Sequence, residues 1–557
     1  MSSGHSIKNI FQRSPLARTL VWVSILLIGL SIALFAGRKD SRKPEVSSVN
    51  PPIGAPGDIV VIKGSGFGRE KENSFVEISG SRITSSGYRS WSDNEITIEL
   101  PSNLQDGLFV VQTLAGRSEP LFFANSSGIP VAVRPDQRTS QPTVDSLSPQ
   151  SAGIGDVVTI LGSNFGGTRG NSKVYFTFAQ DGTSLPDSGE YIASSDSDYD
   201  IEYWSDTEIH VRVPDGAVSG NLYISTDKGS SPKQNFTVNF PVGRKKMTSL
   251  RTYVIQVSSD IQNRDGQGSR VTLYVPRPAV SASQPSVEIQ EVNPMPLIAD
   301  DMNNIIHQVT LSAENTSRIR LNQSFIVTDY SIESGIDASK VSRYSDKTRL
   351  LYTVYTTADS GIPGSSDVTE LSKSIVGKTK SPYDQAKKIY DYMLANYKIL
   401  NTVRTGNVSV TDMIERKSGD AYDFALLFTA LCRAAGIPAV PVSGVLVENN
   451  STTRNHWWSE IYFEHYGWFP VDIALAAGLN YKPFAEIEDT AEYYFGNLDS
   501  QHIAFSRKWN NLRPALVNSR TVYRPRTYAL QTIWEESSSA TASYSSLWND
   551  PVVVGIY

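Results

Sequence analysis

Two stretches of this chain repeat each other, and the repeat limits the possible fold more than any other feature. Residues 57–68 (GDIVVIKGSGFG) match residues 155–166 (GDVVTILGSNFG) at an offset of 98 residues. A second pair, residues 91–101 (WSDNEITIELP) and 204–214 (WSDTEIHVRVP), lies at an offset of 113. Each copy alternates apolar and polar residues between Gly and Pro corners, which predicts short strands and tight turns. We therefore expect two small β-sandwiches.

The repeats resemble the IPT/TIG family of immunoglobulin-like domains. The resemblance rests on the P-x-x-G-x-x-V/I-x-I-x-G-x-x-F-G core and on the W-S-D-x-x-I-x-V-x-V-P strand, which both occur twice. It covers residues 44–124 and 141–240, and it implies spacing, adhesion, or carbohydrate or protein contact outside the cell. Asp58 and Asp156 each follow a turn glycine, so we interpret them as turn or cap residues rather than metal ligands. Gly64, like Gly162 in the second copy, is expected at a bulge or turn with positive φ.

The composition excludes several classes of protein. The formal net charge of -6 and the pI of about 5.7 argue against a nucleic-acid binder, whose domains tend to be basic. The single cysteine, Cys432, excludes a disulfide framework and a thiolate zinc site. We expect neither a cofactor nor a metal. The mean hydropathy of -0.25 excludes a polytopic membrane protein.

One apolar run near the N-terminus predicts a membrane anchor. Residues 19–37 carry no charge and, at about 1.5 Å per residue, reach roughly 28 Å, enough to cross a bilayer core. A cleaved signal peptide is the alternative, but its apolar region is normally shorter. We therefore expect an uncut transmembrane helix with residues 1–18 in the cytoplasm. The bulk of the chain would then be periplasmic or extracellular, in a bacterial cell envelope.

The second half changes from strand to helix patterns. Alternation continues over residues 248–337, where we expect a third β-sandwich. After Ser365 the apolar residues recur at helical spacing. Ser381, Pro382 and Asp384 form a helix start with an N-cap, an N1 proline and an N3 acid.

A second helix, residues 421–434 (AYDFALLFTALCRA), is apolar nearly all round, which predicts a buried central helix. A Gly stop and a Pro follow it, at residues 435–438. Short apolar runs predict three strands, over residues 440–447, 456–463 and 468–472.

This second half resembles transglutaminase-like domains, a superfamily that shares the papain-like fold. The resemblance implies an α+β domain over residues 338–506, with a C-terminal extension at 507–557. It also implies that the preceding β-sandwich is the β domain often found before such a core. The motifs that carry it are the runs Gly419–Asp423 (GDAYD) and Leu431–Ala439 (LCRAAGIPA), then His456-x-Trp458-x-Glu460 and Gly467-Trp468 … Val471-Asp472.

The chain departs from this family at the catalytic position. The resemblance places a nucleophilic cysteine directly after Gly-Asp, where this chain has Ala421. A helix N-terminus lowers a thiol pKa, and a facing imidazole oriented by a carboxylate completes the nucleophile. The resemblance assigns the last two roles to His456 and Asp472. Ala421 has no lone pair, so covalent catalysis fails at that site. The resemblance makes Cys432 an ordinary core residue, about three helical turns further on.

The aromatic residues near these positions have two interpretations. Tyr422, Trp457, Trp458 and Trp468 either line a ligand cleft or belong to the core. An open groove between the central helix and the His456 strand would favour binding. A groove plugged by side chains or by the C-terminal tail, residues 547–557, would refute binding in this cleft and leave the structural role.

The sequence therefore predicts a multidomain envelope protein with a transmembrane helix, three β-sandwiches and a catalytically degenerate transglutaminase-like domain. Its expected partners are a peptide, a protein or a cell-wall component, and not nucleic acid. A transamidase or peptidase is the alternative if Ala421 replaces a native cysteine by engineering. A purely structural spacer is the third possibility.

Overall fold

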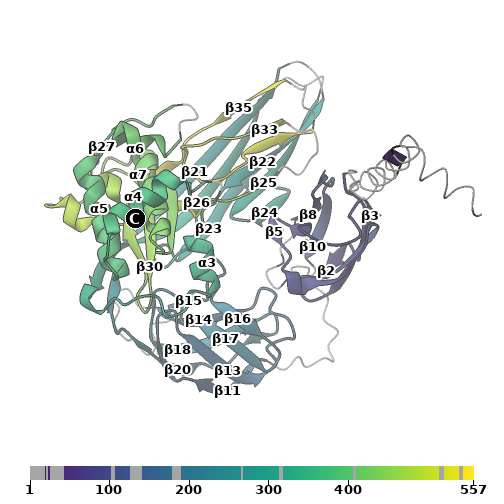
Figure 1. The fold of residues 1–557 in the computed structure, drawn as a ribbon, viewed down its shortest axis with the longest axis horizontal. Coiled ribbons are helices and arrows are strands. Elements are labelled where there is room, and N and C mark those ends of the chain that lie inside the picture. Colours follow the sequence, from purple (N-terminus) through teal and green to yellow (C-terminus); the bar gives the residue numbers. More distant parts are fainter. Residues whose placement is uncertain are drawn as a thin grey trace, which may run out of the picture.

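The computed structural model describes most of the chain after residue 42, and Figure 1 shows how its domains are arranged. A large body joins the second repeat, a β domain and a mixed helix–strand domain, and the first repeat lies beside this body. The described residues are 19, 23–24, 43–101, 104, 107–125, 141–178, 190–264, 268–312, 318–359, 361–405, 409–513, 520–538 and 543–557.

Most of the predicted membrane segment, residues 19–37, lies outside the described residues. Only Thr19, Val23 and Ser24 of that segment are described, and all three are helical. Within the described part of the chain, no helix has both the length and the apolar character needed to span a bilayer. The expected N-terminal transmembrane helix therefore has no support in the structure and stays a prediction.

The two repeats fold into β-sandwiches with the same strand order. The sheets of the first repeat are β1-β3-β7-β6 and β2-β10-β8-β4-β5, and those of the second are β11-β13-β17-β16 and β12-β20-β18-β14-β15. The first repeat comprises β1 (Glu45–Asn50), β2 (Ile53–Gly54), β3 (Ile59–Ser65), β4 (Phe75–Ile78), β5 (Ser81–Arg82), η1 (Ser85–Gly87), β6 (Tyr88–Trp91), β7 (Glu95–Glu99), β8 (Gly107–Thr113), β9 (Gly116–Arg117) and β10 (Leu121–Asn125). The second comprises β11 (Thr143–Ser148), β12 (Ser151–Gly153), β13 (Val157–Ser163), β14 (Lys173–Phe178), β15 (Tyr191–Ala193), β16 (Ile201–Trp204), β17 (Glu208–Arg212), β18 (Ala217–Thr226), β19 (Gly229–Ser230) and β20 (Gln234–Asn239).

The repeated glycines and aspartates have local structural roles. A Cβ atom on Gly64 would lie 1.9 Å from the carbonyl oxygen of Glu45, and one on Gly162 would meet its counterpart at 2.0 Å. Close approach of two strands beside a bulge, rather than positive φ, therefore requires these glycines. Asp58 and Asp156 each accept a backbone N–H three residues earlier, at 2.8 Å, which confirms their turn role.

The third sandwich, called the β domain here, is built from two distant parts of the chain. Its N-terminal part runs from residue 243 to 336, close to the expected 248–337. One sheet has the order β23-β26-β21-β35, with β36 also on β21, and the other has the order β24-β25-β22-β34-β33. The strands are β21 (Gly243–Asn263), β22 (Ser269–Pro276), β23 (Ser286–Asn293), β24 (Ile298–Asp301), β25 (Asn304–Leu311), β26 (Arg318–Ile336), β33 (Arg520–Val522), β34 (Glu535–Ser537), β35 (Tyr544–Trp548) and β36 (Val552–Ile556).

The C-terminal segment, residues 507–557, thus belongs to the β domain. Its last strand runs antiparallel to β21, with Ile556 opposite Tyr253. Val553 of that strand is buried in the core that Tyr253 and Trp534 share. The segment that sequence analysis separated as an extension completes both sheets of the sandwich.

The mixed domain packs helices against a four-stranded antiparallel sheet of order β31-β30-β29-β32. The central helix α7 (Ala421–Ala434) has the predicted bounds, and every residue from Ala421 to Arg433 is buried. The other elements are η3 (Ala338–Lys340), α3 (Leu350–Thr356), α4 (Ser366–Val376), α5 (Pro382–Asn396), β27 (Lys398–Ile399), α6 (Asp412–Arg416), β28 (Ser418–Gly419), β29 (Ala439–Val447), β30 (Thr453–Phe463), β31 (Gly467–Val471), α8 (Ile473–Ala476), α9 (Thr490–Tyr493) and β32 (His502–Arg507).

Polar contacts fix the second repeat against the mixed domain. Lys245 binds both carboxylate oxygens of Asp215 at 2.7 Å and also contacts the carbonyl oxygen of Trp468. Tyr355 donates to the carbonyl oxygen of Ser197 at 2.6 Å. These groups are largely buried, and an unmade buried hydrogen bond is costly, so the contacts favour one fixed orientation.

Candidate functional site

The first turn of α7 begins at Ala421, the position at which sequence analysis expected a nucleophile. Asp420 is the N-cap and Ala421 is the first helical residue. Asp420 Oδ1 accepts from the backbone N–H of Asp423 at 3.0 Å, and Asp423 Oδ2 accepts from the backbone N–H of Asp420 at 3.2 Å. The two acids therefore form a reciprocal capping box at the start of α7.

Two arginines far away in sequence neutralise this acidic pair. Arg526 Nη1 donates to both Asp420 oxygens at 2.6 and 2.8 Å, and its Nη2 donates to Asp423 at 2.8 Å. Arg404 adds its backbone N–H to Asp420 at 2.7 Å and Nη2 to Asp423 at 2.8 Å. Burial, followed by the neighbouring Asp423, raises the pKa of Asp420. The guanidinium of Arg526 also lies 4.4 Å from the ring centroid of Tyr422, so the C-terminal segment covers the start of α7.

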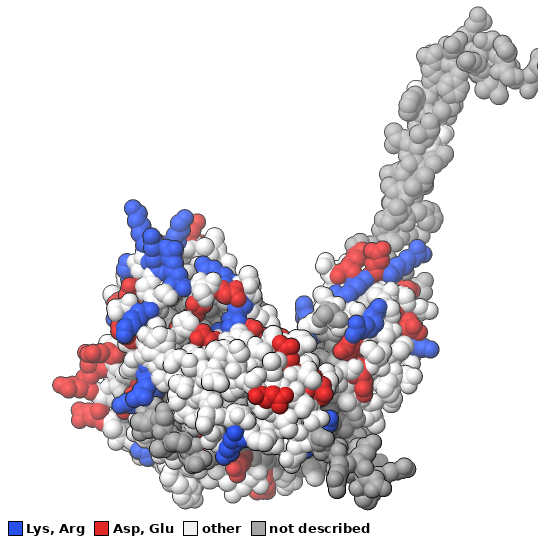
Figure 2. Space-filling view, turned by 90° about the horizontal axis from the view of Figure 1, so that it is seen from below, with Lys and Arg blue, Asp and Glu red and all other residues white. Residues whose placement is uncertain are grey.

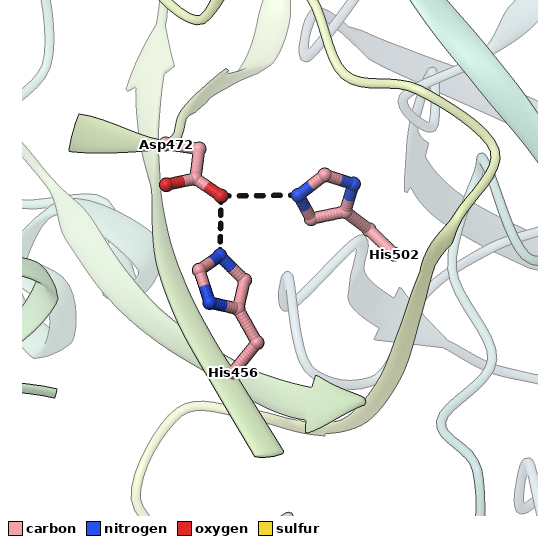
Figure 3. A group of neighbouring side chains, drawn as sticks. All are labelled: His456, Asp472 and His502. Atoms are coloured by element: carbon pink, nitrogen blue, oxygen red, sulfur yellow. Dashed lines mark hydrogen bonds and ion pairs between the residues drawn. The ribbon is translucent and has the colours of Figure 1, made fainter. Parts of the chain in front are cut away.

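His456 and Asp472 meet, as the motif spacing implied. The Nε2 atom of His456, on β30, lies 2.5 Å from Oδ2 of Asp472, which follows β31 and caps α8 (Figure 3). His456 is 1% exposed and Asp472 is fully buried. Burial lowers the pKa of His456 although Asp472 opposes the shift, so we assign a neutral imidazole that donates through Nε2. Its Nδ1 atom is buried and has no hydrogen-bond partner among the described residues.

A second histidine, His502, completes the cluster. Its Nε2 atom lies 3.0 Å from the same Oδ2 of Asp472, and its Nδ1 atom lies 2.8 Å from Oδ1 of Asp499 (Figure 3). Both nitrogens face carboxylates, so both carry protons. Burial alone would lower the pKa of His502, but the two aspartates raise it to about 10. His502 is therefore a buried imidazolium, and together with His456 it holds the pKa of Asp472 below its usual range against the effect of burial.

This cluster has the residue types of a metal site but not the free ligand atoms. The nearest donor atoms of His456, Asp472 and His502 lie within 4.8 Å of one another. A doubly protonated imidazole has no lone pair to offer a cation. Asp472 Oδ2 already serves two imidazoles, and its Oδ1 accepts the backbone N–H of Leu475 at 2.9 Å. Among the described residues, the Nδ1 atom of His456 is the one nitrogen of this cluster left without a hydrogen-bond partner, and a single free nitrogen does not make a metal site.

The positions that sequence analysis assigned to the site are all closed to solvent. Ala421 is 5% exposed, and Tyr422 is 6% exposed. Tyr422 packs edge-on against Trp457 with ring centroids 5.6 Å apart, which brings the first turn of α7 against the start of β30. Burial raises the pKa of Tyr422, and Tyr523 of the C-terminal segment hydrogen-bonds to it.

The remaining aromatic candidates occupy two places. Trp458 stacks on His456 with ring centroids 6.1 Å apart, next to His502. Trp468 lies against Tyr355, 5.5 Å between centroids, at the junction with the second repeat. Trp457, Trp458 and Trp468 are all buried. All three tryptophans belong to the hydrophobic core, and a role in a cleft wall stays a prediction.

Cys432 lies in the last turns of α7 and is fully buried. Burial raises the pKa of its thiol well above the usual range. The thiol is therefore protonated and inaccessible, as expected for a structural cysteine.

Comparison with known families agrees with both resemblances. The transglutaminase-like superfamily model matches residues 369–473, and the IPT/TIG domain model matches residues 44–127 and 142–240. The chain therefore contains two IPT/TIG domains, called TIG1 and TIG2 below, and a transglutaminase-like core. That combination fits an envelope or binding protein.

A Haemophilus influenzae (strain ATCC 51907 / DSM 11121 / KW20 / Rd) protein described as uncharacterized is 27% identical over 168 residues, which are 25% of this chain and 46% of that protein. The chain thus matches less than half the length of this relative. A candidate cysteine protease from Cytophaga hutchinsonii is 14% identical with a TM-score of 0.35, over 56% of this chain and 91% of that one. The periplasmic domain of TgpA from Pseudomonas aeruginosa is 14% identical with a TM-score of 0.24, over 42% and 88%.

Sequence analysis did not single out His502, Asp499, Arg404 or Arg526. No motif marks them, because the tertiary fold brings them to the site from three parts of the chain: Arg404, the pair Asp499 and His502, and Arg526. One signal was available for His502, which begins an apolar run, HIAF, typical of a buried strand. A histidine at the start of such a run needs a buried polar partner.

Proposed function

We propose that this chain is a single-pass, membrane-anchored protein of the bacterial envelope whose transglutaminase-like domain is catalytically silent. The observation that carries the proposal is Ala421 at the first position of α7. A methyl group there supplies no electron pair, while His456 keeps the imidazole and Asp472 the carboxylate of the family's site. The bare Nδ1 of His456 supports the same conclusion, because a general base without a nucleophile leaves that nitrogen unpartnered.

Burial of the site supports a role at other surfaces. Arg526 and Tyr523 cover the start of α7, and His456 is 1% exposed. A site covered by side chains and by the C-terminal segment leaves no open groove for a ligand, which favours a structural role for the degenerate site. Binding of a peptide, protein or cell-wall component is then assigned to the outer surfaces, including the TIG domains. The transglutaminase-like core serves as the rigid body that holds them.

The activity test compares the purified protein with His456→Ala. Both proteins are assayed for amide hydrolysis and for transfer of a glutamine acyl group to an amine. We expect equal rates at the level of the uncatalysed reaction, because positioning alone adds little without a nucleophile. A rate in the unchanged protein that falls at least about tenfold in His456→Ala would reveal a nucleophile and disprove the proposal.

A purely structural spacer is the second candidate, and the closed site favours it specifically. Envelope extract passed over the immobilised ectodomain distinguishes the two roles. If the protein is only a spacer, the immobilised ectodomain should retain the same envelope components as a control surface that carries no TIG domains. Specific retention that is lost on TIG-surface substitutions would support the binding role.

A further inference from the structure

An open cleft of about 500 Å³ lies between TIG1 and the start of the C-terminal segment, far from His456 in the sequence. Its walls come from β4, β5, β8 and β9 of TIG1 and from Arg513. Figure 2 shows a hollow between TIG1 and the larger body. A cavity of this volume has the size of sites that hold small organic ligands.

Three guanidinium groups line this cleft, those of Arg82, Arg117 and Arg513. One carboxylate, Glu77, is shared by two of them: it lies 3.1 Å from Arg117 and 3.4 Å from Arg513. Among the described residues, no carboxylate lies within salt-bridge distance of Arg82. Glu536 of the β domain acts on Arg117 from further away. Even with both acids counted, positive charges outnumber negative ones in the cleft.

Two of the arginines pack against one aromatic ring. Arg82 lies 3.8 Å from the ring centroid of Phe75, and Arg513 lies 5.0 Å from the same centroid. A guanidinium stacked on an aromatic ring keeps its N–H groups free at the edges for an oxyanion. The Phe75 ring thus orients two arginines toward one cleft.

Arg117 provides unsatisfied donors beside the same cleft. Its Nε and Nη1 atoms are buried and have no hydrogen-bond partner among the described residues. Buried donors without acceptors are rare and unfavourable. Burial, with Arg513 adding to the effect, lowers the pKa of Arg117. An anion bound in the cleft would offset the repulsion between the arginines.

The uncharged lining indicates what carries the anion. Gln112 and Thr113 add amide and hydroxyl groups next to the arginines. Phe75, the aromatic residue of the cleft, is already covered by two guanidiniums, so Leu114 is the main apolar surface left in the lining. A carboxylate on a hydroxyl-rich ligand matches this lining better than a peptide does.

We propose that this arginine cleft binds an acidic oligosaccharide through the carboxylate of a uronic-acid residue. The proposal goes beyond the silent transglutaminase-like core and does not depend on it. Bidentate arginine–carboxylate pairs fix the sugar, and the neutral polar groups contact its hydroxyls. No covalent step is involved.

The test is titration calorimetry on the full-length protein in detergent, with digalacturonate as the probe. We expect saturable binding that weakens as salt is raised from low to physiological levels, because ion pairs are screened. Arg82→Gln should weaken binding by about tenfold or more, the usual effect of losing a charged hydrogen bond. Arg82 is exposed, so this variant should keep the fold. Arg69→Gln, an exposed TIG1 arginine outside the cleft lining, is the matched control and should bind as the unchanged protein does.

Two further probes separate the possible ligands. Neutral lactose should not bind, because it lacks the carboxylate. Inorganic phosphate should bind weakly at most. The proposal is overturned if digalacturonate fails to bind, if Arg82→Gln binds it unchanged, or if phosphate binds as tightly as digalacturonate. The last result would identify a simple oxyanion site.

Discussion

Arg526 binds both carboxylate oxygens of Asp420, the N-cap of α7, at 2.6 and 2.8 Å. The two residues are 106 positions apart in the sequence and both are buried. The contact joins the last part of the chain to the first turn of the central helix. In effect, the C-terminal segment both completes the β domain and closes the transglutaminase-like site.

Removing this cation should strongly destabilise the fold. In Arg526→Gln the buried carboxylates of Asp420 and Asp423 lose their main partner, and breaking a buried pair on one side costs roughly 3–5 kcal/mol. The free energy of unfolding is measured by urea denaturation. Arg343→Gln, a change at an exposed arginine, should alter it by less than about 0.5 kcal/mol. Equal stability of the two variants would show that the Arg526 contact is not formed in solution.

The buried imidazolium of His502 should make stability fall at high pH. Its pKa rises from 6.5 in the unfolded chain to about 10 in the fold, so the folded state holds the proton more tightly. The stabilisation is complete below pH 6.5 and is lost as the pH rises toward 10. His502→Gln should be less stable at pH 6 and should lack this part of the pH dependence.

Chemical denaturation between pH 6 and 10 measures the difference between the two proteins. His210→Gln, at a partly exposed histidine of TIG2, serves as the control and should follow the unchanged protein. A constant difference between His502→Gln and the unchanged protein over this range would contradict the assignment of a proton to His502.

The last strand offers a matched pair of neighbouring positions. Val553 is 7% exposed and packs in the β-domain core, whereas Val554 is 57% exposed. Val553→Asp should lower the free energy of unfolding by roughly 2–4 kcal/mol, because it buries an unpaired polar group. Val554→Asp should change it by less than about 0.5 kcal/mol. If thermal unfolding shows both variants equally stable, β36 is not docked on β21.

The membrane anchor can be tested by fractionation. If residues 19–37 form an uncut helix, the protein keeps its original N-terminus and stays with membranes after a high-salt wash. Protease added outside the inner membrane should degrade everything past Arg38. A mature N-terminus near Arg38 would instead identify a cleaved signal and a secreted protein.

Local patterns determined a large part of this structure. The repeat predicted two small β-sandwiches, and uniform apolarity with a Gly-Pro stop predicted the bounds of α7. The motif spacing brought His456 to Asp472. Each of these features depends on residues that are close in sequence or on the pairing of two neighbouring strands. Local sequence patterns are therefore enough to predict them.

Only the tertiary structure decided what surrounds these elements. His502, Arg526 and the strands of the C-terminal segment reach the core over long sequence distances, and no local pattern encodes such contacts. The closure of the site also depends on long-range contacts, because distant segments of the chain bury His456. The sequence by itself placed Ala421 directly after Gly419 and Asp420, at the start of the central helix. The fold added a histidine that keeps Asp472 charged and an arginine that seals the helix N-terminus, since buried charges require partners wherever the chain can supply them.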